Sequence, residues 1–475
     1  MIILILLGLL SFQLFLLTNL QFTAWPEMLS YPYLRNEGFL LYKDMIYPYP
    51  PLLTVFLSFV YKFFGYDVIV LKTVAWTIIL FSSAILYYFA NYITGKKIIA
   101  LISVGFYVLI QPFFEGNMLW FDMAIVPPVL LGTYFALRWI QEKNDNFLLL
   151  TSFFLSTAAL IKQTAALFLI ILGMYVIFRG VTRGRLVKLA FPPLMLLTLL
   201  VIRLVQEQAL QDFINWTILY PLGEWGKFSG YVQMSLSGRQ ILVTIILLTP
   251  ILLYNIVLPA IAVFRRLQAG RRKILSDITS LLLLLLLVVS LVMVYPRFSF
   301  FHLQLALAFI VLNLTLVVKS WDVKRVIMLF SGVVLLLIPF IHKPVLAVDW
   351  QKDTRFYETK DIDLANKIAN IADRKDKVFF LGLHSSLYVI ADRLPPKRWT
   401  DNFIWYLEIP GVQEEIVSRW EKNPPVYVFW RQPSVGNSFD LGVYQPKKIV
   451  EYIQNHYNFV SELVLGVQTW KLKKD

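Results

Sequence analysis

Long apolar runs recur along most of this chain and predict a bundle of membrane-spanning helices. A helix needs about 20 consecutive apolar residues to cross roughly 30 Å of hydrocarbon. Eleven runs approach that length, centred near residues 11, 80, 106, 128, 153, 171, 197, 251, 285, 311 and 333. The runs at 147–161 and 164–178 are short and interrupted by Ile-Lys-Gln-Thr, so the number of spans can differ by two. The pattern predicts a mainly α-helical, polytopic membrane protein.

The composition supports this class and excludes others. Of 475 residues, 58% are hydrophobic and only 16% are charged, whereas soluble domains carry about 25% charged residues. The mean hydropathy is +0.65. The absence of cysteine excludes disulfides, thiol catalysis, zinc fingers and iron–sulfur clusters. The first 22 residues lack a basic segment and a small-residue cleavage site, so we expect a retained helix rather than a cleaved signal peptide.

The basic residues predict the orientation of the helices. The net charge of +14 could suggest nucleic-acid binding, but the basic residues fall in every second loop. Such loops face the cytoplasm, so we expect a plasma-membrane protein with a cytoplasmic N-terminus and an extracytoplasmic C-terminal region. The clusters are Lys96 and Lys97; Arg138 and Lys143; Arg179, Arg183, Arg185 and Lys188; Arg265, Arg266, Arg271, Arg272 and Lys273; and Lys319, Lys324 and Arg325.

The chain becomes polar from about residue 345, which predicts a second domain. A helical period covers 361–372, and an amphipathic helix is expected at 446–457. Short strand-like runs occupy 378–383, 426–430 and 463–472. We therefore expect a transmembrane domain over 1–344 and a small extracytoplasmic α/β domain over 345–475.

The first predicted outer loop contains two acidic candidates for catalysis, Glu27 and Asp44. A carboxylate at a membrane boundary is costly unless it faces protein or water, which favours a functional role for Glu27. The alternative is a solvated acid at the interface. Residues 47–65, which follow Asp44, are short, aromatic and rich in proline, and predict a helix lying in the membrane interface.

The second predicted outer loop contains Glu115, Asn117 and Asp122. Two acidic loops on one face could hold a divalent cation such as Mg²⁺ or Mn²⁺, or position an acceptor group. Alternatively, Glu115 and Asn117 solvate a tight turn and Asp122 caps the following helix.

Three basic residues are candidates for binding an anionic lipid headgroup. Arg297 and His302 are five residues apart among aromatic residues, and the planar guanidinium suits phosphate. Lys162 lies between two apolar segments. It could pair with a lipid phosphate, or extend to the membrane surface. Arg297 could instead be part of an interfacial aromatic belt.

An ordered set of motifs resembles a known family. It comprises Glu27 after the first apolar run, Gly-Phe-Leu-Leu-Tyr-Lys-Asp (38–44), the segment 50–65, Gly-Asn-x-Leu-Trp-Phe-Asp (116–122), Leu-Ile-Lys-Gln-Thr (160–164) and Tyr-Pro-Arg-Phe-Ser-Phe-Phe-His (295–302). The set resembles the GT-C membrane glycosyltransferases, in particular protein O-mannosyltransferases and lipid A aminoarabinose transferase. Residues 387–399 are similar to the soluble tail of bacterial members.

The resemblance implies a role for each candidate residue. Glu27 matches the catalytic base of the family, which is usually aspartate, and Asp44 matches a residue expected to hold the loop together. Lys162 and Arg297 match basic residues that contact the lipid phosphate. A sugar on a polyprenyl phosphate would be the donor, and the anomeric configuration would be inverted.

We therefore expect a glycosyltransferase that acts on a lipid, glycan or protein acceptor at the outer face of the membrane. The lipid-linked donor agrees with the absence of a nucleotide-binding fingerprint and of a P-loop. The alternatives are a lipid or sugar transporter or flippase, a membrane acyltransferase, and a non-enzymatic envelope scaffold. A transporter would be expected to show internal symmetry and charges at mid-membrane depth, whereas the polar residues here lie at one predicted face.

Overall fold

The computed structural model describes residues 1–178, 182–254, 278–432 and 444–473. The predicted cytoplasmic residues Arg179, Arg265, Arg266, Arg271, Arg272 and Lys273 lie outside these ranges. The chain divides into two compact units. The first, called the helical unit below, contains Met1–Phe22, Thr73–Leu196 and Gln233–Lys352. The second, called the mixed unit, contains Thr23–Lys72, Leu197–Val232 and Asp353–Asp475.

Each predicted apolar run coincides with a helix. These helices are α1 (Ile2–Asn19), α4 (Val68–Thr94), α5 (Lys97–Ile110), α7 (Val126–Glu142), α8 (Asn146–Ile161), α9 (Ala166–Phe178), α10 (Arg183–Gln206), α13 (Gly238–Leu252), α15 (Ile278–Val292), α16 (Gln304–Val317) and α17 (Val323–Leu337). Within the described ranges, six helical stretches are long and apolar enough to cross a membrane, and the other apolar helices have 10–17 residues. The polytopic helical class is therefore confirmed, while the number of spans stays a prediction.

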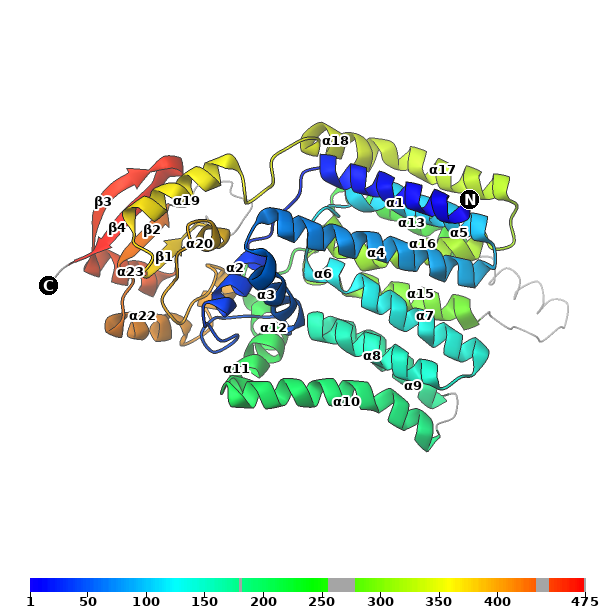
Figure 1. Ribbon diagram of the computed structural model, residues 1–475, viewed down its shortest axis with the longest axis horizontal. Helices are drawn as coiled ribbons and strands as arrows, with labels where there is room; N and C mark the ends of the chain where they lie inside the picture. Colours follow the sequence, from blue (N-terminus) through cyan, green and yellow to red (C-terminus); the bar gives the residue numbers. More distant parts are fainter. Residues whose placement is uncertain (179–181, 255–277, 433–443, 474–475) are drawn as a thin grey trace. The chain divides into compact units, whose positions relative to one another are not determined.

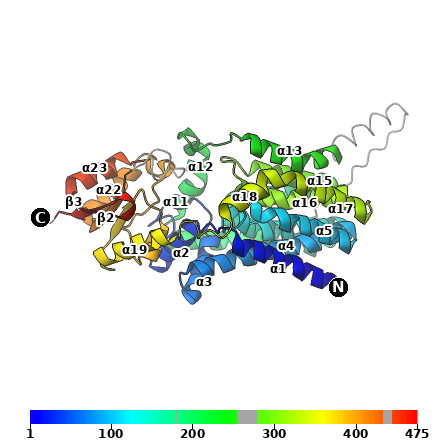
Figure 2. The ribbon, with the colours of Figure 1, turned by 90° about the horizontal axis from the view of Figure 1, so that it is seen from above.

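Helix α16 lies at the centre of the helical unit. All of its residues are buried, and it packs against α5, α13 and α15. Figure 1 labels α16 within this bundle, and Figure 2 shows α5, α13 and α15 of the same bundle from above. Its polar side chains are hydrogen-bonded, as burial requires. Thr315 Oγ1 donates to Ser103 Oγ of α5 at 2.9 Å, and Asn313 Nδ2 donates to the Leu283 carbonyl of α15 at 3.1 Å.

A chain of buried amides joins further elements of the helical unit. Gln13 of α1 donates to Gln111 at 3.1 Å, and Gln111 donates to Gln304 of α16 at 3.1 Å. Ser83 of α4 donates to Gln13 at 2.7 Å. Gln111 belongs to the 3₁₀ turn Gln111–Phe113 that ends α5, so this chain fixes the position where the second predicted outer loop begins.

The C-terminal part of the mixed unit is a four-stranded sheet covered on both faces. Its order is β1 (Val378–Leu381), β2 (Tyr427–Arg431), β4 (Val467–Leu472) and β3 (Tyr457–Leu463); β1 and β2 are parallel, and the other pairs are antiparallel. Adjacent strand residues point to opposite faces: Phe379 contacts Trp420 of α22 (Val412–Lys422), and Phe380 stacks on Tyr388 of α20 (Ser386–Ile390). The helices of this region are visible in Figure 1.

The predicted elements of this region are largely confirmed. The helix expected at 361–372 is α19 (Thr359–Ile371), the helix at 446–457 is α23 (Lys447–His456), and the three predicted strands overlap β1, β2 and β4. Strand β3 and helix α22 were not predicted. Tyr457 begins β3 directly after α23, without a turn residue to mark the change.

The first predicted outer loop folds into two packed helices within the mixed unit. These are α2 (Glu27–Asn36) and α3 (Leu52–Phe64), and α3 begins directly after Pro50 and Pro51. Proline suits the first turn of a helix because it has no backbone N–H to leave unpaired. The remaining short helices are α6 (Phe121–Ala124), α11 (Leu210–Ile214), α12 (Tyr220–Gly223), α18 (Lys343–Asp349) and α21 (Ile404–Leu407).

Candidate active site

Glu27 is the first residue of α2. A carboxylate is favourable at a helix N-terminus because the backbone N–H groups there carry partial positive charge. Here, however, Oε2 is buried and has no hydrogen-bond partner in the described ranges. Burial and the charge of Asp401 raise the pKa of Glu27 above its ordinary value. Such a carboxyl can accept a proton near neutral pH.

Asp401 is a second buried acidic residue of the mixed unit, and sequence reasoning missed it. It is 5% exposed, and its Oδ2 also lacks a partner among the described residues. Burial raises its pKa, although a hydrogen bond from Ser385 opposes this effect. No sequence motif marks Asp401, which belongs to the C-terminal segment of the same unit and acts on Glu27 through its charge.

Aromatic side chains surround the two carboxyl groups. The ring of Tyr31 lies 4.9 Å from that of Tyr47 and 5.2 Å from that of Trp399, measured between centroids. Burial and the charges of Asp401 and Glu27 raise the pKa of Tyr31. Both tyrosine hydroxyl groups have other partners. Tyr31 donates to the Ile46 carbonyl at 2.8 Å, and the Tyr47 and Thr54 hydroxyl groups share a hydrogen bond of 2.6 Å.

Asp44, the other predicted catalytic acid, is bound on two sides. It accepts from the Leu40 backbone N–H at 3.0 Å and from Lys397 Nζ at 2.8 Å. Lys397 also donates to the Gly38 carbonyl at 3.0 Å. These bonds tie residues 38–44 to the segment at 397, which fits the loop-holding role implied by the resemblance better than proton transfer.

Asp122 of the helical unit is paired with two predicted phosphate ligands. Lys162 Nζ lies 2.6 Å from Asp122 Oδ1, and His302 Nδ1 lies 2.9 Å from Asp122 Oδ2. The Asp122 side chain is only 3% exposed, while Lys162 and His302 are 12% and 17% exposed. Three residues predicted in separate loops thus form one cluster, and Asp122 is its counter-ion.

Asn117 and Glu115 have structural contacts. The Asn117 amide donates to the carbonyls of Leu17 and Leu20, each at 2.8 Å, and accepts from Trp76 Nε1 at 2.9 Å. Glu115 Oε2 accepts from the Phe301 backbone N–H at 3.4 Å.

The divalent cation, Mg²⁺ or Mn²⁺, expected between the acidic loops stays a prediction. Within the described ranges, no three His, Asp or Glu side chains are grouped as a metal site. An ammonium already occupies one oxygen of Asp122, where a cation would be repelled, and Asn117 uses its amide for backbone carbonyls.

Arg297 lies in a segment held by backbone pairing. The Gln233 N–H donates to the Pro296 carbonyl and the Phe298 N–H donates to the Gln233 carbonyl, both at 2.8 Å. The Arg297 side chain is half-buried.

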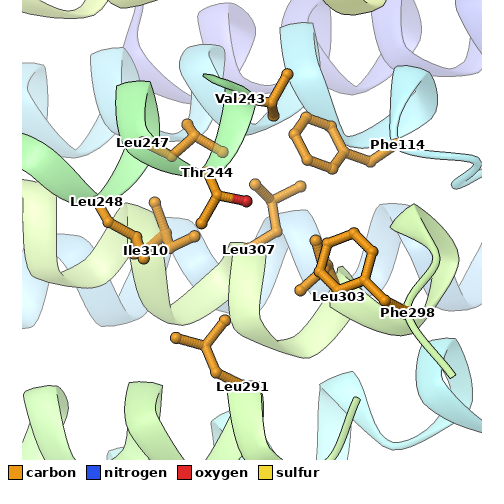
Figure 3. A pocket seen from close by; sticks show the side chains of 10 residues that line it. All are labelled: Phe114, Val243, Thr244, Leu247, Leu248, Leu291, Phe298, Leu303, Leu307 and Ile310. Carbon is orange, nitrogen blue, oxygen red and sulfur yellow. The ribbon is translucent and has the colours of Figure 1, made fainter. Parts of the chain in front are cut away.

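The helical unit contains an apolar pocket (Figure 3). Some of the residues that line it are direct neighbours, in the sequence, of the polar residues described above. Its lining includes Phe114, Phe298 and Leu303, the neighbours of Glu115, Arg297 and His302. In Figure 3, Thr244 carries the oxygen atom seen among the lining side chains. The complete lining is Phe114, Val243, Thr244, Leu247, Leu248, Leu291, Phe298, Leu303, Leu307 and Ile310.

Comparisons with known proteins agree with this architecture. The family model described as dolichyl-phosphate-mannose-protein mannosyltransferase matches residues 48–208. A search of curated proteins finds no significant match.

Solved structures with a similar fold include ArnT from Cupriavidus metallidurans bound to undecaprenyl phosphate. The match has a TM-score of 0.55 and 10% sequence identity, and it covers 98% of this chain and 97% of ArnT. Another is the Archaeoglobus fulgidus oligosaccharyltransferase in complex with Zn and sulfate, with a TM-score of 0.53 and 10% identity, covering 98% and 73%. The same enzyme tethered to an acceptor peptide has a TM-score of 0.54 and 9% identity, covering 100% and 74%.

These findings confirm the resemblance predicted from the motifs. The protein is a multi-pass membrane protein with the GT-C fold and a small C-terminal α/β region. The orientation of its termini and the roles of the site residues stay predictions.

Proposed function

We propose that this protein is an inverting membrane glycosyltransferase that moves a sugar from a polyprenyl-phosphate donor to an acceptor at the outer face of the membrane. The GT-C fold and the match to the mannosyltransferase family model support the class of reaction. The observation that carries the proposal is Glu27, a carboxyl with a buried oxygen that lacks a protein partner in the described ranges.

In the proposed reaction, Glu27 takes the proton of an acceptor hydroxyl or amine. The acceptor atom attacks the anomeric carbon while the bond from that carbon to the phosphate oxygen breaks. A single displacement inverts the anomeric configuration and releases the polyprenyl phosphate. General-base help of this kind contributes typically 10²- to 10⁴-fold in rate.

The donor would bind in the helical unit. The apolar pocket suits part of a prenyl chain, since nearly all of its lining is hydrocarbon. The adjacent residues Arg297 and His302 would then face the phosphate. Arginine would stabilise the charge that develops on the leaving phosphate, an effect worth a few kcal/mol per donor. Undecaprenyl phosphate bound to ArnT is an example of such a lipid in a protein of similar fold.

In this proposal Lys162 binds the phosphate with only part of its ammonium group, because Asp122 holds one of its N–H donors. Asp122 orients its ammonium through one hydrogen bond, which leaves two N–H donors available to the phosphate. Asp122 also holds the His302 ring, so one buried carboxylate would position two phosphate ligands.

The test replaces Glu27 in cells and measures lipid-linked sugars by mass spectrometry. Cells without the protein should accumulate a polyprenyl-phosphate sugar, and the wild-type gene should abolish the accumulation. Glu27→Gln should fail to do so at normal expression, whereas Glu27→Asp, which keeps a carboxylate, should restore part of the turnover. Glu37→Gln, at an exposed carboxylate at the end of α2, is the matched control and should behave as wild type. Full complementation by Glu27→Gln would exclude Glu27 as the base.

A further inference from the structure

The mixed unit contains another cavity, which is lined mainly by charged side chains. Its volume is about 200 Å³, which is room for several water molecules or a small ligand, since a water molecule takes up about 30 Å³ in the liquid. The lining residues come from separate stretches of the C-terminal part of the unit: Arg355, Phe356, Glu358, Lys360, Asp361, His384, Arg431 and Leu465. These residues differ from those of the proposed catalytic and donor sites.

Both carboxylates of this cavity are paired with cations of the same cavity. Lys360 Nζ lies 2.5 Å from Glu358 Oε2, and His384 Nε2 lies 3.2 Å from Asp361 Oδ1. Burial raises the pKa of Asp361, but the hydrogen bond and the charge of His384 outweigh this effect and hold the pKa below its ordinary value. Asp361 is therefore ionised near neutral pH, with its charge compensated inside the cavity.

The hydrogen bonds of His384 indicate that its ring carries both protons. Ser386 Oγ lies 3.1 Å from the Phe356 carbonyl and must donate there, because a carbonyl oxygen can only accept. The single hydroxyl proton of Ser386 is then used, so its bond with His384 Nδ1 needs the proton of the ring. On the other side of the ring, Nε2 donates to the Asp361 carboxylate. Both nitrogens thus donate, which is the imidazolium form.

Two arginines give the cavity an excess of positive charge. Neither Arg355 nor Arg431 forms an ion pair with a residue in the described ranges. The Arg355 guanidinium lies 5.1 Å from the centroid of the Phe356 ring, and Arg431 is half-buried at the end of β2. Together with Lys360 and the His384 imidazolium, four cations line a cavity that contains two carboxylates. The excess of two charges has no counter-ion among the described lining residues.

The apolar part of the lining has an unusual backbone conformation. Phe356 and Leu465 have φ angles of +64° and +63°, a region that bulky side chains rarely adopt. Such residues persist only where the surrounding structure holds them, and they cluster at ligand sites. Phe356 is held by the Trp25 ring at 5.6 Å between centroids, and the Ala24 N–H donates to the Arg355 carbonyl at 3.1 Å. These contacts fix one wall of the cavity before a ligand binds.

We propose that this cavity binds the phosphate group of an organic ligand, with Arg355 and Arg431 as its main partners. A phosphate monoester carries close to two negative charges near pH 7 and has three acceptor oxygens, which matches the excess of two positive charges. The planar fork of a guanidinium suits such a group. Phe356 and Leu465 offer an apolar surface to the carbon part of the ligand. A lipid headgroup and a soluble phosphate ester share this chemistry.

The test measures binding to the full-length protein in detergent by isothermal titration calorimetry. The probes are glycerol 3-phosphate and dihexanoyl phosphatidic acid, and glycerol is the uncharged control. Wild type should bind a phosphate ester and not glycerol. Arg355→Gln and Arg431→Gln should each weaken this binding about tenfold or more, because each removes charge-assisted hydrogen bonds. Arg431→Lys, which keeps the charge without the fork, should lose less.

The matched control is Lys367→Gln. Lys367 is exposed on α19 and does not line the cavity, so this variant removes one positive charge of the same unit and should bind as wild type. The melting temperature of each variant confirms that it is folded. Binding by neither probe, or arginine variants that bind as tightly as Lys367→Gln, would overturn the proposal.

The two probes distinguish the source of the phosphate. Binding of dihexanoyl phosphatidic acid at least tenfold tighter than that of glycerol 3-phosphate, weakened in Arg431→Gln, assigns the cavity to a lipid headgroup. Similar affinities for both probes assign it to a soluble ester.

Glu27→Gln separates this site from the proposed function. Glu27 does not line the cavity, so Glu27→Gln should bind the phosphate ester as wild type while transfer is lost. Binding that disappears in Glu27→Gln would place the phosphate at the catalytic residue and overturn the separate site. Transfer that survives Glu27→Gln refutes only the proposed function and leaves the result for Arg355 and Arg431 in force.

Discussion

At the scale of single residues, Asp122 acts as a counter-ion. Sequence reasoning treated it as a cation ligand or helix cap, but its oxygens are 2.6 Å from an ammonium and 2.9 Å from an imidazole nitrogen. Breaking a buried ion pair by removing one partner is costly because the other charge stays buried.

We therefore expect Asp122→Asn to lower the free energy of unfolding by about 3–5 kcal/mol, measured by denaturant unfolding in detergent. Adding Lys162→Gln should recover part of the loss, because the uncompensated ammonium is removed. Glu142→Gln is the control: it breaks an exposed pair with Arg138 and should change stability little. An Asp122→Asn protein as stable as this control would contradict the pairing.

At the scale of elements, the turn after α5 depends on one glycine. The Gly116 carbonyl accepts a hydrogen bond from Gln111 Nε2 at 2.9 Å, within the amide chain that joins α1, α4 and α16. A Cβ at Gly116 would overlap the Gln111 carbonyl and its side-chain amide. The neighbouring Asn117 anchors the same turn to the end of α1.

We expect Gly116→Ala to cost roughly 1–3 kcal/mol, because the Cβ forces Gln111 out of place and weakens its bond to Gln304. The measurement is the thermal unfolding midpoint in detergent. Gly8→Ala, where a Cβ meets no atom within 4 Å, is the matched control and should leave the midpoint unchanged or slightly higher. Equal midpoints for the two variants would show that the turn adapts.

At the scale of the whole molecule, the charge distribution predicts an orientation in the membrane, and this prediction is open to direct measurement. The chain has no cysteine, so single introduced cysteines report accessibility without background. Lys375 is exposed in the mixed unit and Lys97 is exposed at the start of α5.

The positive-inside pattern predicts that Lys375→Cys reacts with a membrane-impermeant maleimide in intact cells. Lys97→Cys should react only after the membrane is opened. The reverse labelling pattern would invert the predicted topology and place the proposed catalytic site on the cytoplasmic side.

The periodicity of this chain predicted its elements well, for a definite reason. Helices in a bilayer need long apolar runs, and each of the eleven centres falls inside a helix. The α/β region was also recognisable, because buried strands such as β1 carry uninterrupted apolar residues. Strand β3 is mostly exposed and follows α23 without a turn signal, so nothing local distinguished it.

The sequence alone determined the membrane class and the helical elements, and it made Glu27 a candidate site residue. Hydropathy and the place of a carboxylate near the end of an apolar run are local properties, so both can be read from the sequence. The tertiary structure decided what each polar residue contacts. It joined Asp122 to Lys162 and His302 and tied Asp44 to Lys397. Such pairings join residues far apart in the chain, and burial sets their strength. Neither the partner nor its burial is encoded in any local stretch of sequence.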